Sequence, residues 1–185
     1  SPESSVSNIK EQHRVSAEVH ASNNGHVEQG EITDVAIVGA GPTGLFASFY
    51  AGLRGLSVQI IDSLEEVGGQ LSAMYPEKYI YDVIGYPKVL AKDFVSACME
   101  QALRSDPVIH LREQVQTLEK LEDGTFVLHT TQGQRRSRSV IIAAGVGAFE
   151  PTRLGASGVE SLEGQGIHYF AKKIEDFRDK HVVIV

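Results

Sequence analysis

The feature of this sequence that most constrains its fold is the glycine-rich loop Gly39-Ala40-Gly41-Pro42-Thr43-Gly44, which has the pattern G-x-G-x-x-G. The apolar run Val35–Val38 precedes the loop and is typical of a strand buried on both faces. Residues Leu45–Arg54 follow the loop and predict a helix. A glycine loop in this context predicts a turn that holds the pyrophosphate of a dinucleotide at the N-terminus of the helix.

Each glycine of the loop has its own physical task. Gly39 allows the tight turn, Gly41 lets the pyrophosphate approach the backbone, and Gly44 lets the helix pack closely against the strand. A second buried strand is predicted over Leu56–Ile61, directly before Asp62. The Asp62 carboxylate could accept hydrogen bonds from ribose hydroxyls and would repel a 2′-phosphate, so we do not expect NADP at this first site. A structural turn beside a solvated Asp62 is the alternative, and the loop alone does not separate FAD from NAD.

The order of the predicted elements indicates an α/β fold. The first strand, the helix and the second strand form a βαβ unit with a parallel pair of strands. An ordered loop is predicted over residues 63–90, because Gly, Pro and Tyr are frequent there without a clear period. The remaining predicted elements are a helix over Ala91–Ser105, a strand over Val108–Leu111, and strands over Val115–Leu121, Phe126–Thr131 and Arg136–Ile142, with hairpin turns at Asp123-Gly124 and Gln132-Gly133. The chain is therefore predicted to be a Rossmann-like βαβ unit with an inserted three-stranded β-meander.

Composition and charge limit the partners that this chain can bind. The apolar fraction of 42% is enough to bury a core, and the net charge of -7 argues against nucleic acid or an anionic membrane as the main partner. No apolar run reaches the roughly 20 residues of a membrane-spanning helix. The sole cysteine, Cys98, falls on the packed stripe of the predicted helix. We therefore expect a buried structural thiol in a protein of a reducing, cytoplasmic compartment.

The segment after Asp62 carries groups that suit a flavin. Gly68-Gly69-Gln70-Leu71 combines bare backbone with an amide that can both donate and accept hydrogen bonds. An isoalloxazine ring presents donors and acceptors along one edge and broad apolar faces, and Tyr75 could lie against such a face. Ordinary loop structure explains the same residues equally well, so their chemistry alone leaves both interpretations open.

A longer stretch resembles a known family. Residues 67–83, VGGQLSAMYPEKYIYDV, resemble the signature of ferredoxin–NADP+ reductases of the thioredoxin-reductase-like type, and residues 85–88 continue it. Residues 141–151, IIAAGVGAFEP, resemble the second glycine bend of the same family. The resemblance covers residues 32–185, and its tyrosine-rich stretch is not general to Rossmann proteins.

This resemblance implies a homodimeric, two-domain flavoenzyme that transfers electrons between NADPH and ferredoxin or flavodoxin through FAD. It also implies that an NADPH domain is inserted into the FAD domain. The matching residues imply FAD contacts at Gly39, Gly41, Thr43 and Gly44 in the loop, at Asp62, at Gln70 and Tyr75, at the backbone of Val115, and at Phe149. Val115 and Phe149 could instead serve packing alone. The flavin supplies the redox chemistry, so no protein acid or base is assigned.

Thioredoxin reductases, which share the fold that the resemblance implies, are the nearest alternative. They carry a C-x-x-C pair at the start of the NADPH domain, and this pair exchanges with the flavin. Residues 166–173 resemble that segment, but Phe170 and Lys173 stand where the cysteines would be. Without a dithiol, electrons must leave the flavin directly, which suits a one-electron acceptor. Lys172 and Lys173 could steer an acidic partner or could simply be a solvated pair.

The resemblance also predicts domain boundaries. Residues 1–30 are polar, and we expect a mobile tail with solvated histidines. Residues 31–152 are expected to form the first segment of the FAD-binding domain, and residues 153–185 a linker and the first strand of the NADPH-binding domain. The apolar run Val182–Val185 predicts that strand, and no second glycine loop follows it, so we expect a fragment of a longer protein. A truncated nucleotide-binding module without activity is a further alternative. An NAD-dependent dehydrogenase is the last alternative, and the long loop and the meander argue against it.

Overall fold

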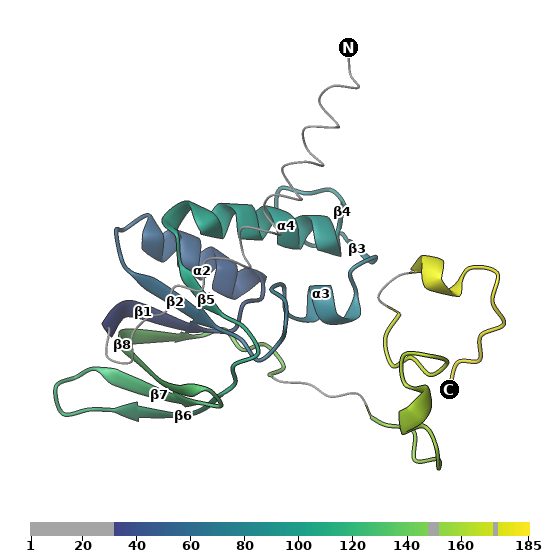
Figure 1. The fold of residues 1–185 in the computed structure, drawn as a ribbon. Helices are drawn as coiled ribbons and strands as arrows, with labels where there is room; N and C mark the ends of the chain where they lie inside the picture. The colour runs from purple at the N-terminus through teal and green to yellow at the C-terminus, as the bar shows by residue number, and fades with distance from the viewer. Residues whose placement is uncertain (1–31, 148–151, 172–173) are drawn as a thin grey trace. The chain divides into compact units, whose positions relative to one another are not determined.

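The computed structural model describes residues 32–147, 152–171 and 174–185, and its centre is one six-stranded sheet (Figure 1). The strands lie in the order β5-β2-β1-β8-β7-β6. Their bounds are β1 Ile32–Val38, β2 Val58–Ile61, β5 Val108–His110, β6 Val115–Lys120, β7 Phe126–Thr130 and β8 Gly133–Ile142. Each coincides with a predicted strand. β8 begins earlier than predicted because Gly133 already pairs with Thr130 across the turn.

β1 is the strand around which the parallel half of the sheet forms. It pairs parallel with β2 on one side and with β8 on the other, so that Ile37 lies opposite both Ile60 and Ile141. β2 in turn pairs parallel with β5. The predicted βαβ unit is confirmed. The carboxyl ends of these four strands lie along one edge of the sheet, where open α/β folds bind their ligands.

Two helices cover one face of this parallel half (Figure 1). α2 spans Pro42–Gly52, and α4 spans Ala91–Ala102 before a 3₁₀ turn at Leu103–Ser105. Cys98 of α4 lies on the predicted packed stripe but is only partly buried against the core cluster, and this burial raises the pKa of its thiol. The buried members of this cluster are Val35, Ile37, Ala40, Leu45, Ala51, Val58, Ile60 and Ala102.

The meander extends the main sheet and is not a separate insert. β6 and β7 form an antiparallel hairpin, and β7 pairs antiparallel with β8. β8 is shared, because Arg136 lies opposite Val127 of β7 on one side and opposite Ile32 of β1 on the other. The predicted meander is therefore confirmed, and its third strand also belongs to the parallel half.

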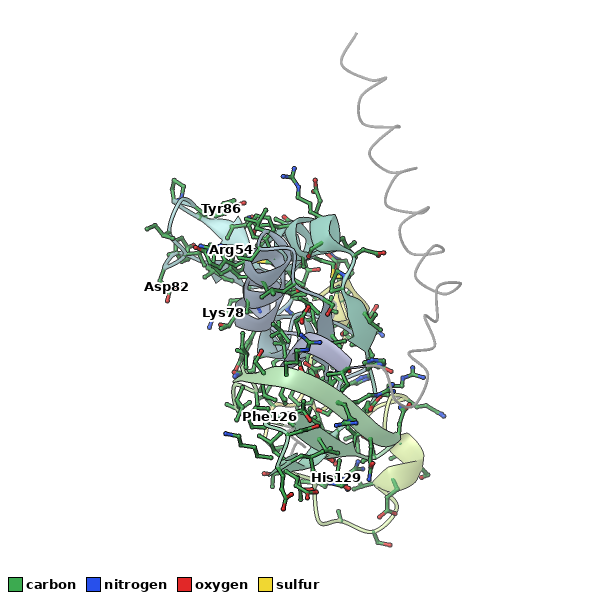
Figure 2. All side chains as sticks on the ribbon, turned by 90° about the vertical axis from the view of Figure 1, so that its left-hand side faces the viewer. Arg54, Lys78, Asp82, Tyr86, Phe126 and His129 are labelled. Atoms are coloured by element: carbon green, nitrogen blue, oxygen red, sulfur yellow. The ribbon has the colours of Figure 1, made fainter. Side chains whose placement is uncertain are left out.

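A second, smaller core lies on the sheet face away from the helices. Ala36 and Ile61 alternate along their strands with residues of the first core, so their side chains point to the opposite face. Leu128 of β7 packs against both of them. Figure 2 shows the labelled β7 residues Phe126 and His129 on this side, away from α2 and α4. The meander thus covers the face that the helices leave open.

Residues 63–90 are not the plain loop that the sequence predicts. They contain the short helix α3, Gln70–Met74, and an antiparallel pair formed by β3, Tyr79–Ile80, and β4, Val89–Leu90. Elements of five and two residues are too short to show a hydrophobic period, so the sequence pattern does not reveal them.

The C-terminal part of the chain carries two short 3₁₀ helices, Glu160–Leu162 and Ile174–Phe177. The strand predicted over Val182–Val185 is not formed, and Ile184 is 93% exposed. A strand needs a neighbour for its backbone hydrogen bonds, and no described strand lies beside this run. Among the described residues, no helix is long and apolar enough to cross a membrane.

Candidate nucleotide-binding site

The glycine loop leaves β1 in a conformation that glycine adopts most readily. Gly39 has a φ of 109°, and its N–H donates a hydrogen bond of 2.8 Å to the carbonyl oxygen of Ile61. A side chain at Gly39 would collide with the backbone carbonyl of Ala143, which follows β8. α2 begins at Pro42, immediately after this turn. The loop therefore sits where β1, β2 and β8 end, with the N-terminus of α2 open toward it.

The other two glycines of the loop differ in their surroundings. Gly41 is extended, with φ −71° and ψ 178°, and among the described residues other than its chain neighbours, no heavy atom lies within 4 Å of the place where its side chain would begin. That empty space lies in the site. A side chain at Gly44 would instead collide with the carbonyl oxygen of Gly39 and would lie 3.4 Å from Cγ2 of Ile37. Gly44 thus allows α2 to pack against β1.

Asp62, at the end of β2, holds the loop through its carboxylate. Oδ2 accepts a hydrogen bond of 2.6 Å from the N–H of Ala40, and Oδ1 accepts one of 2.8 Å from the N–H of Leu64. The residue is 9% exposed. Each carboxylate oxygen has two lone pairs, so one remains on each for a ligand hydroxyl. The observed task of Asp62 is to fix the loop, and the predicted ribose contact is compatible with this geometry.

The segment before α3 lies directly against the glycine loop. The N–H of Gly68 donates a hydrogen bond of 2.8 Å to the carbonyl oxygen of Ala40. Gly69 has a φ of 59°, and a side chain there would begin 3.3 Å from Cα of Gly41. Gly69 is needed because its backbone lies close to that of Gly41. A side chain at Gly68, whose φ is 109°, would instead collide with the side chains of Ser72 and Val95.

These segments enclose a pocket of about 480 Å³ at the carboxyl edge of the sheet. Its wall combines the glycine loop, the end of β2, the start of α3, the segment before β6 and the bend after β8. The predicted cofactor residues that line the pocket are Gly39, Gly41, Thr43, Asp62, Gln70 and Val115. Of the other predicted residues, Gly44 lies between α2 and β1, Tyr75 does not line this pocket, and Phe149 lies outside the described residues.

Tyr75 ends α3 and is 40% exposed. Nζ of Lys78 lies 5.2 Å from the centroid of its ring, which is a cation–π contact. Gln70, at the other end of α3, faces the site more directly. Its Nε2 lies 3.8 Å from the point where a side chain at Gly145 would begin. Contacts of Tyr75 and Gln70 with a flavin stay predictions.

Glu113 is a pocket residue that sequence analysis missed. It is 1% exposed, and its carboxylate accepts a hydrogen bond of 2.6 Å from Thr130 Oγ1 and two from the guanidinium of Arg135, at 3.0 and 2.9 Å. Burial raises the pKa of Glu113, but the hydrogen bonds from Arg135 and Thr130 outweigh it, so the pKa lies below its ordinary value. No motif marks Glu113. The one sequence feature that could have indicated Glu113 is its position shortly after a parallel strand, because the end of that strand lies at the same edge of the sheet as Asp62.

His110 stands beside this carboxylate. Its Nδ1 lies 4.0 Å from Oε2 of Glu113, and its buried Nε2 has no hydrogen-bond partner among the residues that the structure describes. Burial lowers the pKa of His110 and the charge of Arg135 lowers it further, while Glu113 opposes the shift. The imidazole is therefore neutral over most of the physiological range.

The chemistry of the pocket suits an elongated anionic ligand. A helix N-terminus, a bare stretch of backbone at Gly41 and a second bare stretch at Gly68 and Gly69 supply the kind of surroundings that a pyrophosphate needs. In the part of the chain that the structure describes, no group of three His, Cys, Asp or Glu side chains could hold a metal ion. The fold and the pocket define the first βαβ unit of a dinucleotide-binding oxidoreductase.

Comparison with known proteins names the class. Residues 33–185 match the model of the pyridine nucleotide-disulphide oxidoreductase family, and the chain belongs to this family. A ferredoxin–NADP reductase of Thermus thermophilus is 55% identical over 154 residues, which are 83% of this chain and 46% of that protein. Ferredoxin–NADP reductase 2 of Bacillus cytotoxicus is 51% identical over 157 residues, or 85% of this chain and 48% of its own. The resemblance to ferredoxin–NADP+ reductases is confirmed.

Solved structures of thioredoxin reductases share the fold. The enzyme of T. acidophilum is 28% identical with a TM-score of 0.56, over 72% of this chain and 41% of its own. The enzyme of Streptococcus pyogenes is 25% identical with a TM-score of 0.56, and the match covers 73% of this chain and 41% of that enzyme. The chain spans about half the length of the curated relatives that it matches.

Proposed function

We propose that this chain carries the first segment of the FAD-binding domain of a reductase that transfers electrons between NADPH and ferredoxin or flavodoxin. The observation that carries the proposal is the glycine-loop pocket, in a chain about half identical to relatives named ferredoxin–NADP reductase. Residues 31–152 form the FAD segment, and residues 153–185 begin the NADPH-binding domain, in this proposal. The tail, residues 1–30, precedes both.

The residues of the pocket fit FAD. Gly41 leaves room for a pyrophosphate beside the N-terminus of α2, and Thr43 lies on the same wall. Asp62 retains acceptor capacity for ribose hydroxyls, and Val115 lies further along the same side. Gln70 also lines the pocket. Tyr75 and Phe149 complete the proposed contacts, which rest on the family resemblance. Bound FAD would accept a hydride from NADPH and release single electrons.

The cysteine content favours a one-electron acceptor over a disulfide. The chain has one cysteine, Cys98, which is partly buried against the core cluster, and burial raises the pKa of its thiol. A thiol in such surroundings is a poor nucleophile. Phe170 stands at one of the two positions where thioredoxin reductases carry cysteines. Electrons therefore pass from the flavin directly to a protein such as ferredoxin or flavodoxin.

The electronic spectrum of the full-length protein that contains this chain tests the proposal. The purified protein should be yellow, should bleach with NADPH under argon, and should regain its colour when oxidised ferredoxin or flavodoxin is added. A colourless protein that FAD does not reconstitute would contradict the proposal. Recovery of colour with thioredoxin alone, accompanied by thioredoxin reduction, would instead identify a disulfide reductase.

We also propose that the protein is a homodimer of the cytoplasm. The support for a dimer is an exposed apolar stripe on α2 that includes Phe46, Tyr50 and Leu53. Phe46 and Tyr50 stack on each other with ring centroids 6.3 Å apart. A helix that is apolar on both its inner and outer faces is typical of a helix covered on both sides. The low cysteine content, with Cys98 as the sole cysteine of the chain, supports the compartment.

A further inference from the structure

The wall of the pocket nearest β6 is a short segment, Arg112 to Val115, with unusual backbone geometry. Arg112 has a φ of 56°, a left-handed conformation that a residue other than glycine adopts only where its surroundings hold it. This conformation turns the chain at the end of β5 and places Glu113, Gln114 and Val115 along the pocket. The contacts that hold this turn are therefore the ones that shape the wall.

One set of contacts comes from the β7–β8 hairpin and converges on a single carboxylate. Thr130, the last residue of β7, donates to Oε1 of Glu113 at 2.6 Å. Arg135 of β8 donates from Nε to Oε1 at 3.0 Å and from Nη2 to Oε2 at 2.9 Å. This bidentate interaction fixes the plane of the carboxylate, because both N–H donors of the guanidinium must align with its oxygens.

A second set of contacts joins the backbone of the wall to the same hairpin. The N–H of Thr131 donates to the carbonyl oxygen of Gln114 at 3.0 Å, and Oγ1 of Thr131 accepts from the N–H of Gln114 at 3.1 Å. Nε2 of Gln132 donates to the carbonyl oxygen of Arg112 at 3.0 Å. The turn between β7 and β8 thus touches the wall on both sides of Glu113.

The wall is also tied to the glycine loop. The N–H of Glu113 donates to the carbonyl oxygen of Asp62 at 2.9 Å, and the carboxylate of Asp62 accepts from the N–H of Ala40 at 2.6 Å. Hydrogen bonds therefore run without a break from the β7–β8 hairpin through Glu113 and Asp62 to the loop. In open α/β folds, an acid at the end of the second strand marks the adenosine side of a bound dinucleotide. Glu113 lies on that side.

We propose that Glu113 is a positioning residue for the adenosine half of the bound nucleotide, and this rests on the proposed FAD site. Glu113 acts through Val115, Gln114 and Asp62 and needs no contact of its own with the ligand. The β7–β8 hairpin then serves as a support for the nucleotide pocket, with Arg135 and Thr130 as the groups that hold the carboxylate in place.

Binding of ADP and of FAD, measured by calorimetry on the purified full-length protein, tests this role. Glu113→Gln removes the negative charge to which both N–H donors of Arg135 are hydrogen-bonded. The affinity for ADP and for FAD should then fall on the order of tenfold. Thr130→Val should also weaken ADP binding, while Thr130→Ser, which keeps the hydroxyl, should recover most of the loss. Glu119→Gln is the matched control, because Glu119 is an exposed carboxylate of β6 that contacts His129 and lies outside the Glu113 network.

A purely structural role for Glu113 would lower the melting temperature and leave the affinity of the folded protein unchanged. Met99→Ala, in α4 and away from the pocket wall, supplies that comparison, because it destabilises the core without touching the network. If Glu113→Gln bound ADP with an affinity within twofold of that of the unchanged protein, the positioning role would be wrong. The proposed FAD site would not be affected by that result. If the unchanged protein bound neither ADP nor FAD, that result would contradict both the proposed function and the positioning role of Glu113.

Discussion

At the scale of single residues, Gly41 and Gly44 have opposite reasons for being glycine, although both belong to one motif. Gly41 has an ordinary extended backbone and open space in place of a side chain. Gly44 has no space, because a side chain there would collide with the carbonyl oxygen of Gly39. The motif therefore joins a position with open space in the pocket to a position at which the helix packs closely against the strand.

We expect Gly41→Ala and Gly44→Ala to separate binding from stability. Gly41→Ala should keep the fold, with a free energy of unfolding unchanged or raised by up to about 1 kcal/mol, and should lose FAD because the methyl group fills the pyrophosphate space. Gly44→Ala should lower the free energy of unfolding by about 1 to 3 kcal/mol, since α2 must move away from β1. Urea denaturation and FAD titration measure the two effects. Normal FAD affinity in Gly41→Ala would contradict this assignment.

The buried pair His110 and Glu113 predicts a stability that falls with acidification in two steps. The pKa of His110 is lowered in the fold, so the unfolded chain binds a proton first, and stability declines as the pH falls below the ordinary histidine value of 6.5. The pKa of Glu113 is also lowered, so its contribution is complete above its ordinary value of 4.5 and is lost as the pH falls through the folded value.

Urea denaturation across this pH range checks both steps. His110→Leu should flatten the decline that begins near pH 6.5, and Glu113→Gln should flatten the part below pH 4.5. Each variant should keep the other residue's step but shift its pH, because the imidazole of His110 and the carboxylate of Glu113 lie 4.0 Å apart and each affects the other's pKa. An identical slope in His110→Leu and the unchanged protein between pH 6.5 and 5 would show that His110 does not titrate as its burial implies.

Residues of the site could be predicted from the sequence where a motif or a strand end marked them. The glycine loop and Asp62 are of this kind, and six predicted residues line the pocket. Glu113 could not be predicted, because its burial depends on Arg135 and Thr130, which lie on two other strands. Pairing of that sort becomes visible only when the register of β7 and β8 is known.

At the scale of elements, the predictions succeeded where length and period were sufficient. α4 shows its helical stripe, and β1 and β2 are compact apolar runs. Residues 63–90 have no such signal, so α3, β3 and β4 were missed. Val182–Val185 shows the opposite error: the apolar run is strand-like, but no described strand offers it hydrogen bonds. Composition predicts the tendency to form a strand, and a partner decides whether one forms.

The end of α2 meets the 3₁₀ turn after α4 at a contact that sequence patterns do not reveal. A side chain at Gly52 would collide with the Cβ and Oγ atoms of Ser105. Gly52→Ala should therefore destabilise the protein by about 1 to 3 kcal/mol, although alanine is the better helix former. The double variant Gly52→Ala with Ser105→Gly should recover most of this loss. Additive effects in a thermal-denaturation cycle would rule out the contact as the cause.

At the scale of the whole molecule, the outer face of α2 raises the question of assembly. Phe46 is 54% exposed, Tyr50 50% and Leu53 63%, and they recur at the spacing of one helical face. Arg54 is the charged residue beside them, and it is already satisfied: its guanidinium lies 5.1 Å from the Tyr50 ring centroid and donates to the Tyr50 hydroxyl at 3.0 Å. Burial of the stripe would therefore leave the Arg54 guanidinium with a hydrogen bond and a ring contact from Tyr50.

A second copy of the chain fits this stripe, because a two-fold contact pairs the same surface with itself. Together the three side chains expose roughly 300 Å² of largely apolar surface, which would form the centre of an interface of about 800 Å² per partner. The variant Phe46→Ser, Tyr50→Ser, Leu53→Ser should sediment as a monomer at micromolar concentration, while the unchanged protein sediments as a dimer. Leu118→Ser, on the exposed edge strand β6, is the matched control and should remain dimeric. A variant that stays dimeric with all three changes would place the contact on another face, and a monomeric unchanged protein would contradict the proposed dimer itself.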